Sequence, residues 1–239
     1  MNILRVFGLA AIVLVCSASV GVFERDADIG DTPKTGIVEF NADTGNYRVT
    51  GGGANIWAKV DAFHFAWTRI SGDVVVTADV KFVGAGAVDH RKAVLMIRQN
   101  LDRTAAYADV ALHGDGLTSL QFRPTDGAET AEKRSTVNMP SRIRIARLGN
   151  QFTVYAGKEG EELAPTAPAT VVLEDPVYVG IGVCSHDANT LETAIFSNVR
   201  IETAVTKKAF TDRPESVSVA TFRPLQCALY SSPRLISPR

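Results

Sequence analysis

The chain has 239 residues, of which 46% are hydrophobic and 21% are charged, a composition that excludes disorder over most of its length. Its 19 glycines and 10 prolines follow no fixed period, which excludes a collagen-like repeat. The formal net charge is −1, and the basic side chains are concentrated near the C-terminus. Residues 20–202 are therefore acidic and lack the basic surface that nucleic-acid binding requires.

The N-terminal segment has the pattern of a secretory signal peptide. Met1–Arg5 is short and basic, Val6–Val15 is apolar throughout, and the small residues Cys16–Ser19 follow. The apolar run is shorter than the roughly 20 residues of a membrane-spanning helix. We therefore expect residues 1–21 to be removed and the product to be secreted or periplasmic. A membrane-anchored form that keeps the segment is the alternative.

Residues 22–35 are expected to form a linker, and residues 36–202 a single β-rich domain. Short apolar runs recur there between turn signals, with alternation and almost no helical period. The clearest hairpin turns at Gly149-Asn150, two residues that tolerate positive φ. About twelve strands in one domain favour an all-β, two-sheet antiparallel sandwich over a small closed barrel. The predicted strands are Ile37–Phe40, Tyr47–Thr50, Phe63–Ile70, Val74–Phe82, Val94–Gln99, Ala106–His113, Thr118–Arg123, Arg142–Leu148, Gln151–Ala156, Thr170–Leu173, Val177–Ser185 and Thr193–Ile201.

The C-terminal segment, residues 203–239, changes character. It carries six Lys or Arg against two Asp or Glu, and its four prolines lie among serines with little periodicity. We expect a basic tail rather than a further domain, of the kind that truncation of a longer protein would leave.

One face of each predicted strand is apolar, and the opposite face is polar in an unusual way. Because side chains alternate along a strand, Leu95 and Ile97 face the core while Arg98 faces away from it. Phe63, Phe65 and Trp67 likewise share one face, opposite His64. The polar faces hold few Lys and Glu, and neighbouring strands are expected to bring them together. The expected patch contains Arg98, Tyr107, Asp109, His113, Gln121 and Arg123.

Two interpretations of this patch stay open. Gly180 and Gly182, on the same kind of face, would let a ligand or a loop approach the backbone closely. Alternatively, cross-strand pairs such as Arg98 and Asp109 merely satisfy each other.

The order and spacing of several motifs resemble a bacterial domain family of unknown function. The family is usually described as concanavalin A-like, and some members carry an "enolase regulation" label. The resemblance spans roughly residues 36–202 and implies a jelly-roll sandwich with a concave sheet, the shape in which lectins and some glucanases hold sugars. Some relatives place this domain ahead of a TolB-like β-propeller. The matching motifs are Gly51–Trp57, Asp61–Phe65, Ser71–Asp73, Lys92–Arg98, Gln121–Arg123, Val177–Gly180, Ser185-His186 and Phe196–Val199.

Catalysis has little support in the sequence. Glucanases on this fold place acids as Glu-x-Asp-x-x-Glu along one strand, and no such pattern occurs here. Asp109 is the only acid placed mid-strand on the polar face of the Arg98–Arg123 meander, and it has no obvious acidic partner. We therefore expect no catalytic residues, although an enzyme is not excluded.

Metal binding is weakly indicated, and no cofactor is expected. His64, His113 and His186 would form a zinc site with Asp109 if they shared a face, but their spacing is not diagnostic. Oxygens in the segment Asn41–Asn46 would suit calcium, without the rest of a calcium loop.

The sequence thus predicts an exported, non-catalytic module that binds a carbohydrate or an envelope polymer through its polar concave sheet. The alternative is an interaction or scaffold domain of an envelope or biopolymer-transport-type protein, in which the same patch docks a protein. Trp57 is expected either as a sugar-stacking platform or as a core residue. The candidate ligand-binding residues are Trp57, His64, Arg98, Tyr107, Asp109, Gln121, Arg123 and His186.

Overall fold

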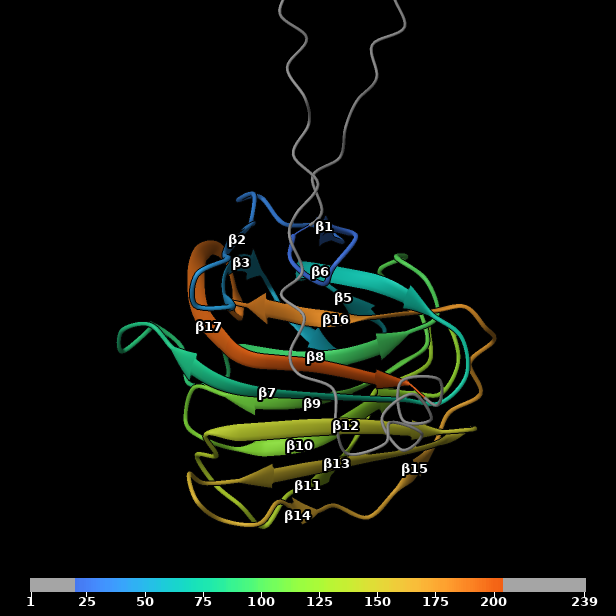
Figure 1. Cartoon of the computed structure of the whole chain (residues 1–239). Coiled ribbons are helices and arrows are strands. Elements are labelled where there is room, and N and C mark those ends of the chain that lie inside the picture. Colours follow the sequence, from blue (N-terminus) through green and yellow to red (C-terminus); the bar gives the residue numbers. More distant parts are fainter. Residues whose placement is uncertain (1–19, 204–239) are drawn as a thin grey trace, which may run out of the picture.

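The computed structural model describes residues 20–203, and regular structure within that range consists of β-strands alone (Figure 1). Two large antiparallel sheets pack against each other, which confirms the predicted all-β, two-sheet jelly-roll sandwich. The expected signal peptide up to Ser19 and the expected tail after Thr203 lie outside the described residues. Residues 20–203 contain no helix that is long and apolar enough to cross a membrane.

The first sheet has seven strands in the order β1-β6-β16-β8-β9-β10-β11. Their bounds are Arg25–Ile29 (β1), Phe63–Ile70 (β6), Val177–Cys184 (β16), Lys92–Arg98 (β8), Tyr107–His113 (β9), Thr118–Arg123 (β10) and Ala131–Arg134 (β11).

The second sheet follows the order β14-β13-β12-β7-β17-β3-β2, and β15 pairs with β13 beside this path. Its strands are Ala164–Pro165 (β14), Gln151–Gly157 (β13), Arg142–Leu148 (β12), Val74–Phe82 (β7), Asp187–Thr203 (β17), Asn46–Gly53 (β3), Ile37–Asn41 (β2) and Ala169–Thr170 (β15). A separate hairpin joins Ile56–Trp57 (β4) to Val60–Asp61 (β5). The predicted hairpin between β12 and β13 is confirmed, with Gly149 at φ 57° in its turn.

The main core lies between the two sheets. The first sheet contributes side chains such as Leu95, Ile97 and Ile181, and the second contributes Val76 and Ile145, all fully buried. Burying each Leu or Ile side chain stabilises the fold by about 1.5–3 kcal/mol. The alternation expected along β8 therefore holds for the face that packs on the second sheet.

The expected linker belongs to the sandwich. Within residues 22–35, β1 pairs with β6 in antiparallel register, and Phe23 is buried in the main core. The polar composition of Arg25–Ile29 hides this strand, because three of its five residues are charged.

The side chains of β6 face the opposite way from the expectation. Ala66 points into the main core, whereas Phe63 and Phe65 lie on the outer face of the seven-stranded sheet. The neighbouring strand explains this choice, because a Cβ on Gly182 would lie 2.9 Å from the Phe63 ring. The glycines of β16 thus make room for aromatic rings of β6, not for a ligand.

Candidate functional site

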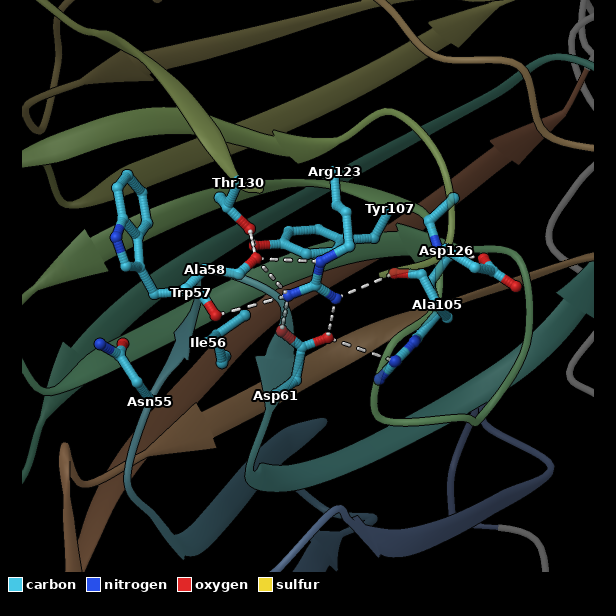
Figure 2. A network of polar contacts seen from close by, with 12 residues as sticks. Asn55, Ile56, Trp57, Ala58, Asp61, Ala105, Tyr107, Arg123, Asp126 and Thr130 are labelled. Carbon is cyan, nitrogen blue, oxygen red and sulfur yellow. Dashed lines mark hydrogen bonds and ion pairs between the residues drawn. The ribbon is translucent and has the colours of Figure 1, made fainter. Parts of the chain in front are cut away.

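The outer face of the seven-stranded sheet carries most of the predicted site residues, but it is not open. Strand pairing aligns Arg98 of β8, Tyr107 of β9 and Arg123 of β10 in one row across the sheet. All three side chains are fully buried. The β4–β5 hairpin covers them, as Figure 2 shows for Arg123 and Tyr107. Arg98, Tyr107 and Arg123 were expected to contact a ligand, but the hairpin leaves none of these side chains exposed.

Asp61, at the end of the hairpin, anchors it to the sheet (Figure 2). Its carboxylate accepts two hydrogen bonds from Arg123, at 2.7 Å from Nη2 and 2.9 Å from Nη1. Arg98 Nη2 lies 3.4 Å from the same carboxylate, and Arg98 also donates to the Asp102 carbonyl at 2.7 Å. Burial raises the pKa of Asp61, and the hydrogen bond from Arg123 opposes this effect. The partner that the sequence suggested for Arg98 was Asp109, and the structure supplies Asp61 instead.

The hairpin turn is held at one backbone oxygen. The Ala58 carbonyl accepts hydrogen bonds from Arg123 Nε at 3.2 Å, from Arg123 Nη2 at 3.1 Å and from Thr130 Oγ1 at 2.9 Å. Ala58 itself has φ 51°, a left-handed conformation that costs free energy in a residue with a side chain. The Arg123 contacts on Ala58 and Asp61 therefore fix both the turn and the second strand of the hairpin.

Beside the hairpin, the outer face opens into a pocket of about 220 Å³, which we call the corner pocket. It lies where β8 begins and β9 ends, at one corner of the sheet. The residues that line it are Asn55, Trp57, His90, Lys92, His113, Leu117, Gln121, Glu132, Arg134 and His186. Of the eight predicted site residues, the structure brings Trp57, Gln121 and His186 together here, with Asp109 next to Gln121 across the β9–β10 pair.

The floor of the corner pocket is polar and buried. Lys92 is 2% exposed and donates to Asn55 Oδ1 and to the Ile56 carbonyl, both at 2.7 Å. Burial lowers the pKa of Lys92. Gln121 Oε1 has no hydrogen-bond partner within residues 20–203, and the neighbouring Ser119 Oγ has none there either. The Asp109 carboxylate finds no side-chain partner in the same range, and burial raises its pKa well above the ordinary value.

Three imidazoles stand around this floor. The ring centroid of His90 lies 5.6 Å from that of His113 and 5.8 Å from that of His186. His113 Nδ1 lies 3.0 Å from the Leu117 carbonyl, so this nitrogen carries the proton and Nε2 is left as an acceptor. Burial lowers the pKa of His113 to about 4. Asn55 Nδ2 lies 3.1 Å from His186 Nε2, which connects the hairpin side of the pocket to the end of β16.

These imidazoles do not form a metal site in the described part of the chain, where no three His, Cys, Asp or Glu side chains are placed to hold an ion. His64, a member of the predicted zinc set, lies on the inner side of β6. It binds Asp28 Oδ1 at 2.7 Å through Nδ1 and Asp26 Oδ2 at 3.1 Å through Nε2. Strand parity therefore places His64 on the opposite face of the sheet from the corner pocket, and the structure does not bring it together with the other candidate residues.

Sequence reasoning missed several pocket residues. Lys92, Glu132 and Arg134 follow the same strand parity as Gln121, so the alternation could have found them once β11 was recognised. His90 and Asn55 lie in connections between strands, where no periodic signal exists. The oxygen of Asn41, proposed for calcium, accepts hydrogen bonds from the backbone N–H groups of Asp43 and Thr44, both at 3.0 Å, in the β2–β3 turn.

A larger groove of about 1000 Å³ lies on the outer face of the eight-stranded sheet. Several polar side chains in and beside it bind one another. Arg142 Nη2 donates to Asp79 at 2.9 Å, Asn198 donates to the same carboxylate at 2.7 Å, and Arg144 donates to Thr77 at 2.9 Å. The groove therefore differs from the corner pocket, whose floor has unpartnered polar atoms.

Solved structures of other proteins resemble this chain, and the likeness to the first one named here supports the fold. A functionally unknown protein from Saccharomyces cerevisiae aligns with TM-score 0.54 at 14% identity, over 72% of this chain and 93% of that chain. Alginate lyase A1-II', a member of polysaccharide lyase family-7, gives 0.49 at 13% identity over 74% and 93%. A β-1,3-1,4-glucanase derived from a mouse hindgut metagenome gives 0.44 at 9% over 67% and 80%. No protein-family model and no curated protein matches the chain. Identities this low indicate a likeness of fold alone.

Proposed function

We propose that this protein is a non-catalytic binding module for a carbohydrate, and that the ligand occupies the corner pocket. The observation that carries the proposal is the pocket floor. Gln121 is 1% exposed, lines the pocket, and leaves its side-chain oxygen without a partner in the described range. An unpartnered buried polar atom costs about 1–3 kcal/mol, which a hydroxyl-rich ligand or water would offset.

Sugars match the chemistry of the lining. A sugar hydroxyl both donates and accepts, so it can donate to Gln121 Oε1 and accept from Arg134. The indole of Trp57 gives the pocket an aromatic wall, and such walls suit the apolar face of a pyranose ring. Binding through an aromatic wall and hydrogen-bonding side chains requires no metal ion.

The secretory pattern of residues 1–21 supports the same proposal, since exported proteins meet polysaccharides of the cell envelope. The competing proposal is an envelope interaction domain. It predicts that the corner pocket binds no sugar and that a protein partner covers it.

The test is an array of oligosaccharides and polysaccharides probed with the purified full chain. We expect binding to a coherent set of sugars and a loss of roughly tenfold or more in affinity, about 1.4 kcal/mol, for Trp57→Ala. Tyr155→Ala is the matched control, because Tyr155 lines the groove on the other sheet and its removal should leave binding unchanged.

Circular dichroism and thermal unfolding of each variant would show that the fold is intact. A blank array from a folded protein would overturn the carbohydrate proposal. Equal losses for Trp57→Ala and Tyr155→Ala would overturn the placement of the site.

A further inference from the structure

We propose that the β4–β5 hairpin determines specificity by closing the site on one side, so that the corner pocket accepts the terminus of a glycan chain and excludes its interior. This inference rests on the proposed carbohydrate binding. It concerns which part of a sugar polymer is bound.

Apolar side chains close the outer face of the seven-stranded sheet on one side of the corner pocket. Over β6, β16 and the middle of β8, this face is covered by a second hydrophobic cluster. Phe63, Phe65 and Met96 are fully buried in it, and Ile56 of the hairpin packs on them. A chain lying across the strands cannot continue past the pocket in this direction, because side chains fill the space.

The outer face is also closed at the end of the strands opposite the corner pocket, where Arg98, Tyr107 and Arg123 are aligned. All three side chains are fully buried, and Asp61 of the hairpin binds both guanidinium groups. Figure 2 shows the contact of Asp61 with Arg123. Displacing this wall would break the ion pairs of Asp61 and expose Ile56 and the apolar side chains on which it packs. The hairpin is therefore a fixed wall and not a lid that a passing chain could lift.

The corner pocket remains open to solvent at one corner of the sheet. Within the pocket lining, Arg134 on the edge strand β11 has 67% of its side chain exposed, and His90 on the β7–β8 connection is also exposed. These two side chains mark the open corner of the sheet. A volume of about 220 Å³ is also below the roughly 300–1,000 Å³ of sites that enclose drug-sized ligands. The pocket thus suits one terminal sugar unit, with the rest of the chain leading outward.

The experiment compares linear and cyclic sugars against the unmodified full chain by titration calorimetry. The probes are free linear gluco-, manno-, xylo- and galacturono-oligosaccharides of two to six units, together with cyclic glucans, which have no chain end. For the series that binds, we expect the disaccharide and the hexasaccharide to differ less than about threefold in Kd, and cyclic glucans not to bind.

An affinity that rises tenfold or more from two to six units, or binding of a cyclic glucan, would overturn the closed-end proposal and leave carbohydrate binding standing. Absence of binding by every probe and by the array would instead overturn the proposed function itself. The two failures are therefore distinguishable without any variant that risks unfolding.

Discussion

The two faces of the seven-stranded sheet are both buried, yet they are buried by different means. Toward the second sheet, Leu95 and Ile97 pack in an aliphatic core. On the outer face of the same strand, Lys92 and Arg98 lie under a hairpin and are 2% and 0% exposed. A charged face on this sheet is therefore not a solvated one. Ion pairs stabilise the charged side chains beneath the hairpin. At the corner pocket, by contrast, some buried polar atoms lack a partner within residues 20–203.

The largest effect should come from breaking the charge network on the outer face. Asp61→Ala removes the carboxylate that pairs with Arg123 and Arg98 and leaves two buried guanidinium groups without their ion-pair partner. We expect a loss of about 3–5 kcal/mol in the free energy of unfolding, measured by urea denaturation. A loss below about 1 kcal/mol would mean that water reaches this face and that the hairpin does not seal it.

The second effect tests whether the two faces are equally well packed. Leu95 and Met96 are adjacent in β8, face opposite sides and are both fully buried. Each truncation to Ala should therefore cost about 2–5 kcal/mol. If Leu95→Ala is costly and Met96→Ala is nearly neutral in the same denaturation assay, the outer cluster is loosely packed. The two faces of the sheet would then not be equally well packed.

The third effect is a dependence of stability on pH, and it arises from His113 in the lining of the corner pocket. His113 has a pKa of about 4 when folded, against 6.5 for an ordinary histidine. Between these values the unfolded chain binds more protons, so stability falls as pH falls from 6.5 toward 4. This single group should account for a loss of about 3 kcal/mol between pH 7 and pH 4.

His113→Gln should remove that part of the pH dependence, as followed by unfolding at each pH. Parallel stability curves for the variant and the unmodified protein would show that His113 is hydrated in the folded state.

The smallest effect is expected on the outer face of the other sheet. Arg142 pairs with Asp79, and its side chain is 48% exposed. Arg142→Ala should cost less than about 1 kcal/mol in the same assay used for Asp61→Ala. A cost comparable to that of Asp61→Ala would show that exposed ion pairs matter as much as buried ones in this protein.

The regular strands could be predicted from sequence because alternation and turn residues report on them directly. Arg142–Leu148, Gly149-Asn150 and Gln151–Gly157 form the hairpin that their pattern indicates. β1 could not be found in the same way, since two of its charged residues, Asp26 and Asp28, bind the buried His64. β4 and β5 are only two residues each, too short for any period to show.

The site was harder to predict because residue type does not reveal what covers a face. Arg98, Tyr107 and Arg123 lie on the predicted face of their strands, but the hairpin that buries them comes from residues far away in sequence. Only long-range contacts, such as Asp61 with Arg123, separate a sealed region from an open one. Gln121 lies on the predicted face of its strand, because the bounds Thr118–Arg123 were predicted as the structure has them.

The edge strand β11 bears on how the isolated protein behaves in solution. Its four residues, Ala131–Arg134, include three charged side chains, and short charged edges discourage pairing with the sheet of another molecule. Glu132 and Arg134 also line the corner pocket. The residues that would face a ligand therefore also protect against aggregation, so neutralising both at once would favour fibrous or amorphous assembly and confound any measurement of affinity.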